Sequence, residues 1–177
     1  FFMNIKKLIF FIEKITLIIG TKVSWLIFIM ALTACTVAFL RYFFNIGFVW
    51  MQESYVWMNG IVFLLGASFT LLYDQHVRVD IFYRNFSEKK KATINILFSI
   101  FLILPFIYIV SKYSMPYVVK SWISLERSRE AGGLKFLYLY KTFIILFCFF
   151  LFIQTIALIL RCILVINQKE KEIFFKF

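Results

Sequence analysis

The chain has 177 residues, of which 63% are hydrophobic, and it carries a formal net charge of +11. A mean hydropathy of +0.89 excludes a soluble domain, because one domain of this size cannot hide so much apolar surface from water. Nucleic-acid binding is disfavoured, since no lysine or arginine falls inside the four long apolar runs. The basic residues gather at the ends of those runs, where they can meet anionic lipid headgroups.

The first 22 residues have the charge pattern of an amphipathic helix. Lys6 and Glu13 are seven positions apart, as are Lys7 and Lys14, so each pair lies on one side of a helix, while phenylalanine and isoleucine fill much of the rest. The pattern predicts a helix on the membrane surface, and a frayed lead-in to the first span is the alternative. These charges also interrupt the apolar core that a cleaved signal peptide needs, and Met3 is a candidate natural start.

Four runs without a charged residue follow, each 18 to 20 residues long. A hydrocarbon core of about 30 Å needs roughly 20 helical residues, and runs that are apolar throughout do not fit the alternating strands of a membrane barrel. The chain is therefore predicted to be one all-α integral membrane domain over residues 1–177, with transmembrane helices at about 23–40, 54–73, 92–111 and 142–160.

The basic residues also predict the orientation of the spans. Thirteen lysines and arginines flank the spans on the side that holds both termini, and seven flank them on the other side. The side richer in lysine and arginine is the cytoplasmic one, so we expect both termini in the cytoplasm, with a basic tail at residues 166–177. The implied location is the bacterial cytoplasmic membrane.

The longest predicted connection runs from Lys112 to Lys141, and its aromatic and basic residues indicate an extracytoplasmic segment at the membrane interface. Pro116 is expected to kink this segment, and Pro105 is expected to kink the third span. Gly132-Gly133 predicts a turn, because glycine takes the positive φ that a helix stop needs.

The middle of each predicted span lacks ionisable residues, which are the usual mark of ion and proton pathways. A self-sufficient channel is therefore disfavoured. Gln154 lies centrally in the fourth span, where its amide needs a hydrogen-bond partner, so it should face protein. The three cysteines lack the spacing of a zinc site or of a disulfide framework, and no cofactor is expected.

The second predicted span has a polar signature at each mouth. Glu53 follows Trp50 at one mouth, as a helix-start carboxylate favoured by the helix dipole or as a polar anchor for a partner helix. Gly66 and its small neighbours form a face that permits close helix approach. The sequence leaves open whether that face meets this chain or a partner.

The other mouth holds the only histidine, His76, between the carboxylates of Asp74 and Asp80. One histidine cannot build a bis-histidine haem or a catalytic zinc site, so a structural hydrogen bond is the main expectation. The alternative is a small integral-membrane enzyme that uses Asp74, His76 and Asp80 at the cytoplasmic face, with a bound metal.

With these residues in hand, the chain resembles the small membrane subunit (DctQ type) of tripartite ATP-independent periplasmic (TRAP) transporters, over roughly residues 20–165. It departs from the family pattern at Gln52, where many members carry a second acid, and at Lys135, where proline is frequent. The residues that carry the resemblance occur in family order: Trp50, Glu53, Gly66-Ala67, His76 to Asp80, Ser124, Glu126, Gly132-Gly133-Leu134 and Gln154.

The resemblance implies a non-enzymatic four-helix subunit that braces a large permease subunit of about twelve spans. It also implies a periplasmic substrate-binding protein, and together such complexes import organic acids with a sodium gradient. Candidate contact or structural residues are Trp50, Gln52, Glu53, Gly66, His76, Arg78, Asp80 and Gln154. A candidate docking surface for the binding protein is formed by Glu126, Arg127, Arg129 and Glu130.

Overall fold

The computed structural model describes residues 2–73 and 86–167. Within these ranges the chain is helical and has no strand. Its elements are α1 (Phe2–Phe44), α2 (Val49–Leu72), α4 (Glu88–Phe98), the π-helical turn η1 (Ser99–Ile103), α5 (Leu104–Ile123) and α6 (Leu137–Ile166). Because α4, η1 and α5 follow one another without a break, the described residues form four rods long and apolar enough to cross a membrane. The prediction of an all-helical chain with four spans is confirmed at this level.

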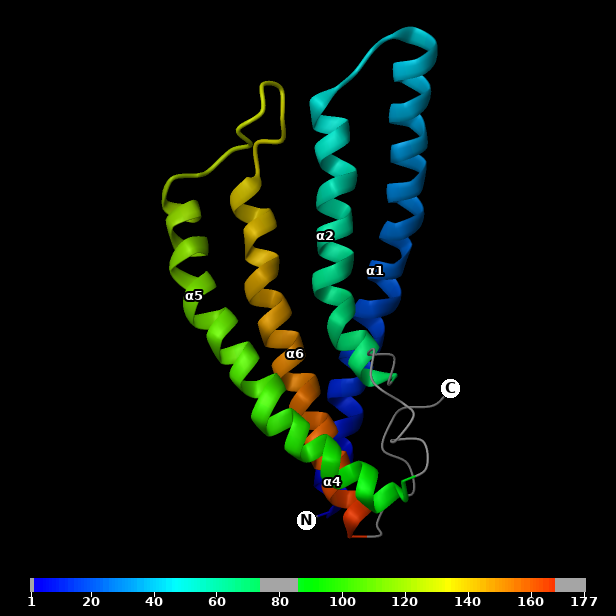
Figure 1. Ribbon diagram of the computed structural model, residues 1–177, viewed down its shortest axis with the longest axis vertical. Helices are drawn as coiled ribbons and strands as arrows, with labels where there is room; N and C mark the ends of the chain where they lie inside the picture. The colour runs from blue at the N-terminus through cyan, green and yellow to red at the C-terminus, as the bar shows by residue number, and fades with distance from the viewer. Residues whose placement is uncertain (1, 74–85, 168–177) are drawn as a thin grey trace.

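The rods run between two ends of the molecule (Figure 1). The connections at residues 45–48 and 124–136 lie together at one end, which we call the loop end. The N-terminus, the end of α2 and the end of α6 lie toward the opposite end, which we call the terminal end. Each rod is therefore antiparallel to the next along the chain.

Helix α6 is the centre of the packing. It contacts α1, α2, α4 and α5, whereas α1 and α5 lie at opposite edges of the molecule (Figure 1). In the most apolar stretch of α6, 33% of the residues are buried, against 6% in that of α1, so α6 faces protein while α1 faces mostly outward. The core cluster consists of Leu71, Ala92, Ile107, Cys148, Leu151, Leu158, Cys162 and Val165.

Helix α1 joins the predicted lead-in and the predicted first span in one helix of 43 residues. Its buried residues recur every three or four positions, which places them on one face, and they all lie in the N-terminal half. That half was expected on the membrane surface, and such a placement stays a prediction. The buried residues of α1 are Ile9, Glu13, Thr16, Gly20 and Val23.

The third rod shows how proline shapes a spanning helix. Pro105 is the second residue of α5, and the π-helical turn η1 ends two positions before it at Ile103. Proline has no N–H to donate and its ring crowds the preceding turn, so the wider turn accommodates it. The irregular turn therefore lies beside Pro105, and the kink expected there stays a prediction. The connection predicted to begin at Lys112 starts later, because α5 continues through Pro116 to Ile123.

Candidate functional site

At the loop end, the connection between α5 and α6 is fastened to α2 by one carboxylate. Ser128 donates its hydroxyl hydrogen to Glu53 Oε1, and the backbone N–H of Leu134 donates to Glu53 Oε2 at 2.6 Å. Within the connection, the Ser128 N–H donates to the Leu134 carbonyl at 3.0 Å. Glu53 therefore holds both ends of a closed loop. We call Glu53, Ser128, Gly133 and Leu134 the Glu53 clasp.

The two glycines of this loop have different tasks. Gly132 has a φ of +79°, which glycine adopts without the steric cost that other residues meet. Gly133 leaves space, because a Cβ there would lie 2.6 Å from Ser128 Oγ and 2.7 Å from Glu53 Oε2. The positive φ predicted for this pair is confirmed at Gly132, although it lies inside the connection and not at a helix end.

A second polar contact ties the loop to the start of α6. Lys141 donates a hydrogen bond to Glu126, and its ammonium lies 3.9 Å from the centre of the Tyr117 ring. The hydrogen bond and the charge of Lys141 lower the pKa of the Glu126 carboxyl below its ordinary value. Close by, Trp122 Nε1 donates to Thr142 Oγ1 at 2.9 Å, so α5 and α6 are joined at their loop ends.

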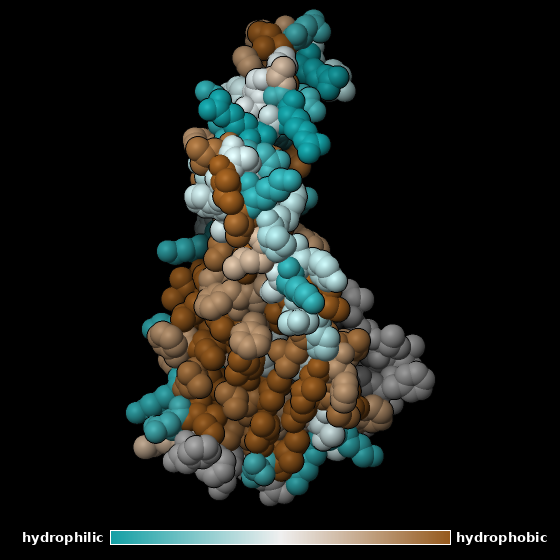
Figure 2. Space-filling model, turned by 90° about the vertical axis from the view of Figure 1, so that its left-hand side faces the viewer, coloured by the Kyte–Doolittle hydropathy of each residue, from teal (hydrophilic) through white to brown (hydrophobic). Residues whose placement is uncertain are grey.

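The predicted docking residues separate into two groups. Glu126 is half-buried and occupied by Lys141, whereas Arg127, Arg129 and Glu130 are exposed. Figure 2 shows hydrophilic residues gathered over the loop end and apolar side chains over the body of the molecule below it. Three of the four residues are therefore accessible to a partner at this end.

Toward the terminal end, α1 and α6 share buried polar side chains. Thr16 Oγ1 donates to Gln154 Oε1 at 2.9 Å, and Arg161 forms an ion pair with Glu13. Glu13 is only 4% exposed and Gln154 only 2%. We call Glu13, Thr16, Gln154 and Arg161 the α1–α6 polar contact. It supplies the partner that the sequence required for Gln154.

The remaining predicted residues are not gathered into one site. Trp50 is about half-exposed beside Phe48 at the loop end, with ring centres 6.1 Å apart. Gln52 is half-buried, and Gly66 has no neighbour within 4 Å of a Cβ position. His76, Arg78 and Asp80, together with Asp74 of the alternative enzyme site, lie outside the described residues.

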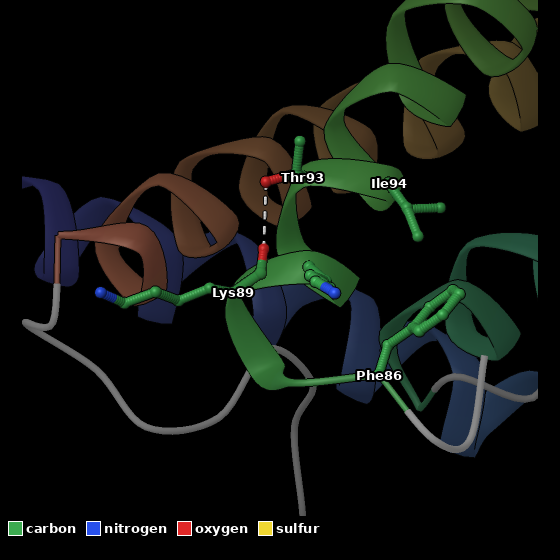
Figure 3. Close-up of a pocket in the computed structure, with 5 residues that line it drawn as sticks. Phe86, Lys89, Thr93 and Ile94 are labelled. Atoms are coloured by element: carbon green, nitrogen blue, oxygen red, sulfur yellow. Dashed lines mark hydrogen bonds between the residues drawn. The ribbon is translucent and has the colours of Figure 1, made fainter.

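Among the described residues, no group of three or more histidine, cysteine or acidic side chains could hold a metal ion. The surface has a shallow hollow at the start of α4, where Thr93 donates to the Lys89 carbonyl at 3.0 Å (Figure 3). The hollow is lined by Phe86, Lys89, Lys90, Thr93 and Ile94, and it holds no carboxylate.

Several of these contacts were missed in the sequence. Glu13 and Arg161 are 148 positions apart, and Leu134 is 81 positions from Glu53. Hydropathy patterns report only local periodicity, so they cannot pair such residues. One signal was available: Glu13 and Arg161 are opposite charges beside apolar runs, and charges near lipid usually have partners.

Four apolar rods, joined by polar contacts at the loop end and toward the terminal end, define a multi-pass helical membrane protein. The family model for tripartite ATP-independent periplasmic transporters, DctQ component, matches residues 29–165. That range includes α2, α4, α5 and nearly all of α6. The chain therefore belongs to the DctQ family and is a small membrane component of a TRAP transporter, a system that also includes a large permease and a substrate-binding protein. No match was found among curated proteins or among solved structures.

Proposed function

We propose that this chain is the scaffold of its transporter, a subunit that braces the large permease and does not itself bind the substrate. The observation that carries this proposal is that the buried side chains of Glu13, Lys141 and Gln154 each contact a polar partner within this chain. Gln154 accepts from Thr16, Arg161 is paired with Glu13, and Glu53 holds the loop. Groups held in this way fix helices in place, whereas a transport path needs groups free to bind and release its cargo.

The proposed cargo is an organic acid, which the substrate-binding protein delivers to the large permease. Uptake is driven by a sodium gradient across the bacterial cytoplasmic membrane, and both termini of this chain face the cytoplasm. The loop end then faces the binding protein. This orientation is supported by the excess of basic residues on the side of the termini.

The exposed charges of the loop end suit the second partner. Arg127, Arg129 and Glu130 are accessible, and the clasp holds the loop that carries them. We propose that they provide a charged surface for the binding protein. Charged side chains at the rim of an interface mainly change the rate of association and its dependence on salt.

The polar residues at the two mouths of α2 complete the proposal. Glu53 fixes the loop within this chain, while Trp50 and Gln52 lie near the loop end for contact with the large permease. His76, Arg78 and Asp80 are proposed to fix the other mouth. If Glu53→Ala and His76→Ala both left complex assembly and uptake unchanged, this part of the proposal would be wrong.

The test is uptake into proteoliposomes that contain the large permease, with the binding protein loaded with a carboxylate outside. We expect sodium-driven uptake with this chain present and at least tenfold less without it. A preparation without a sodium gradient is the control for the driving force. Full uptake in the absence of this chain, or accumulation of substrate by this chain alone, would contradict the scaffold role.

A further inference from the structure

One face of α2 includes the exposed residues Val56, Asn59 and Phe63, with half-buried residues on either side of them. Its residues alternate in steps of four and three, the spacing by which one helix packs along another. Two of them are amides, one is a glycine, and Gln52, Asn59 and Gly66 follow one another at intervals of seven. We call this face the α2 seam, and it consists of Gln52, Val56, Asn59, Phe63 and Gly66.

The seam points away from both helices that pack against α2. On one side of α2, Trp57 stacks on Tyr140 of α6 with ring centres 5.0 Å apart. On another side, Phe69 contacts Gly20 of α1. Helical geometry places the seam opposite these two contacts, and its central residue, Phe63, is 77% exposed.

Asn59 makes this face unsuited to lipid. It is exposed and lies six residues inside α2 from Glu53, about 9 Å along the axis. Its amide has no hydrogen-bond partner among the described residues, whereas Ser68 and Thr70 donate to carbonyls of their own helix. An unpaired amide in hydrocarbon is costly, so Asn59 calls for a partner from another chain.

Gly66 adds a notch on the same face. A Cβ at Gly66 would meet no atom of the described residues within 4 Å, which leaves room beside it for another side chain. At two other helical glycines that space is filled, because Tyr140 covers Gly60 and Phe69 covers Gly20. A helix can approach α2 closely at a small residue of this kind, and van der Waals contact then holds the two together.

The exposed face of α1 provides a comparison. Its largest exposed side chains within the predicted span include Trp25, Phe28 and Leu32, and all are apolar or aromatic. Its hydroxyl residues Thr33 and Thr36 donate to carbonyls of their own helix. The hydroxyls of that face are therefore paired within α1, whereas the Asn59 amide of the α2 seam has no partner among the described residues.

We propose that the α2 seam is the surface on which a transmembrane helix of the large permease docks. The permease helix places a hydrogen-bonding side chain opposite Asn59 and a bulky side chain in the notch at Gly66. This inference rests on the proposed function, since it names the surface by which the scaffold holds the permease.

Site-specific photo-crosslinking tests the location. A photo-reactive phenylalanine analogue is placed at Phe63, or at Phe101 as the control, because Phe101 is 70% exposed on the third rod. In the complex we expect an adduct with the permease from position 63 and none from position 101. Adducts from position 101 alone, from both positions equally, from neither, or between two copies of this chain would overturn the proposal.

Substitutions test the two features separately. Asn59→Leu and Gly66→Leu are each expected to lower the amount of permease that co-purifies by about threefold to thirtyfold. Matched controls are Asn4→Leu, at an exposed amide of α1, and Gly47→Leu, at a glycine that also has nothing within 4 Å of a Cβ position. Unchanged thermal unfolding of the isolated variants in detergent separates lost docking from lost folding, and unchanged co-purification would contradict the seam.

The unsubstituted chain distinguishes this inference from the proposed function. If it retains no large permease in mild detergent or in membranes, the scaffold proposal fails together with the seam. If it retains the permease while the adduct forms elsewhere than position 63, the scaffold proposal stands and only the seam is wrong.

Discussion

The two ends of the molecule are fastened by different chemistry. At the loop end, the Glu53 clasp joins one carboxylate to a serine hydroxyl and a backbone N–H, and it depends on the space that Gly133 leaves. Toward the terminal end, the α1–α6 polar contact joins four side chains from two helices. The clasp positions a loop, and the polar contact fixes the register of two rods.

The two fastenings also differ in their surroundings. Glu53 is half-buried, so water can take over part of its hydrogen bonding if the clasp opens. Glu13 is 4% exposed, and a charge at such a position has little access to water. The clasp lies wholly within the family match at residues 29–165, whereas Glu13 and Thr16 precede it. The comparison suggests that breaking the polar contact costs more stability than breaking the clasp.

The largest effect is expected from Arg161→Leu, which takes the guanidinium of Arg161 away from the buried Glu13 carboxylate. Removing one member of a buried ion pair typically costs about 3–5 kcal/mol. The measurement is thermal or denaturant unfolding of the purified subunit in detergent. The double variant Glu13→Leu/Arg161→Leu should recover most of the loss, because no charge then remains unpaired. A single variant as stable as the unsubstituted chain would show that the pair does not form.

A smaller loss is expected from Gly133→Ala, because the added Cβ would press on Ser128 and Glu53 and open the clasp. We expect a cost of about 1–3 kcal/mol, the range for leaving a buried polar group without its hydrogen bond. Faster protease cleavage within residues 124–136 should accompany it. Gly47→Ala is the matched control, since no atom lies within 4 Å of a Cβ there, and equal effects of the two changes would count against the clasp.

Thr16→Val tests the neutral half of the α1–α6 polar contact. It removes the hydroxyl that donates to Gln154 and keeps the branched shape of the side chain. Hydrogen bonds between membrane helices average about 0.6 kcal/mol, so the expected destabilisation is of that size. Thr33→Val is the control, because that hydroxyl donates only to its own helix. If Thr16→Val lowers the stability no more than Thr33→Val does, then only the ion pair stabilises the α1–α6 polar contact.

The smallest effect is the pH dependence that Glu126 adds at the loop end. Its pKa is lower in the folded chain than the ordinary value of 4.5, so the unfolded chain binds its proton first as the pH falls. The stability that Glu126 contributes is therefore present above pH 4.5 and is lost below it. Unfolding measured from pH 6 down to pH 3 should show a shallower decline for Glu126→Gln. An equal dependence of stability on pH in both proteins would show that Glu126 does not contribute to it.

The sequence predicted the spans well and their limits less well. Apolar runs of 18 to 20 residues marked all four rods, because the thickness of a membrane sets a minimum length. Charged residues were taken as helix ends, and this placed the end of the third rod at Lys112. A helix ends where its backbone hydrogen bonds end, and a lysine on its surface does not interrupt them, so α5 continues to Ile123.

For the candidate site too, the sequence indicated individual residues but not which of them meet in the fold. Glu53 and Gly132-Gly133 were each singled out from their local pattern, but their meeting in one clasp depends on the tertiary fold. Gln154 was expected to need a partner, and nothing local indicated Thr16. The roles expected of His76, Arg78 and Asp80 stay predictions, since those residues lie outside the described part of the chain.

The length of α1 ties this subunit to the thickness of its bilayer. A helix of 43 residues is about 65 Å long, roughly twice the 30 Å of the hydrocarbon. Containing all of it would take a tilt of about 60°, beyond the 0–40° seen for membrane helices, so a part of α1 projects past the hydrocarbon. The thickness of the hydrocarbon then sets how much of α1 is exposed to water. In a thicker membrane, more of the N-terminal half of α1 lies within the hydrocarbon.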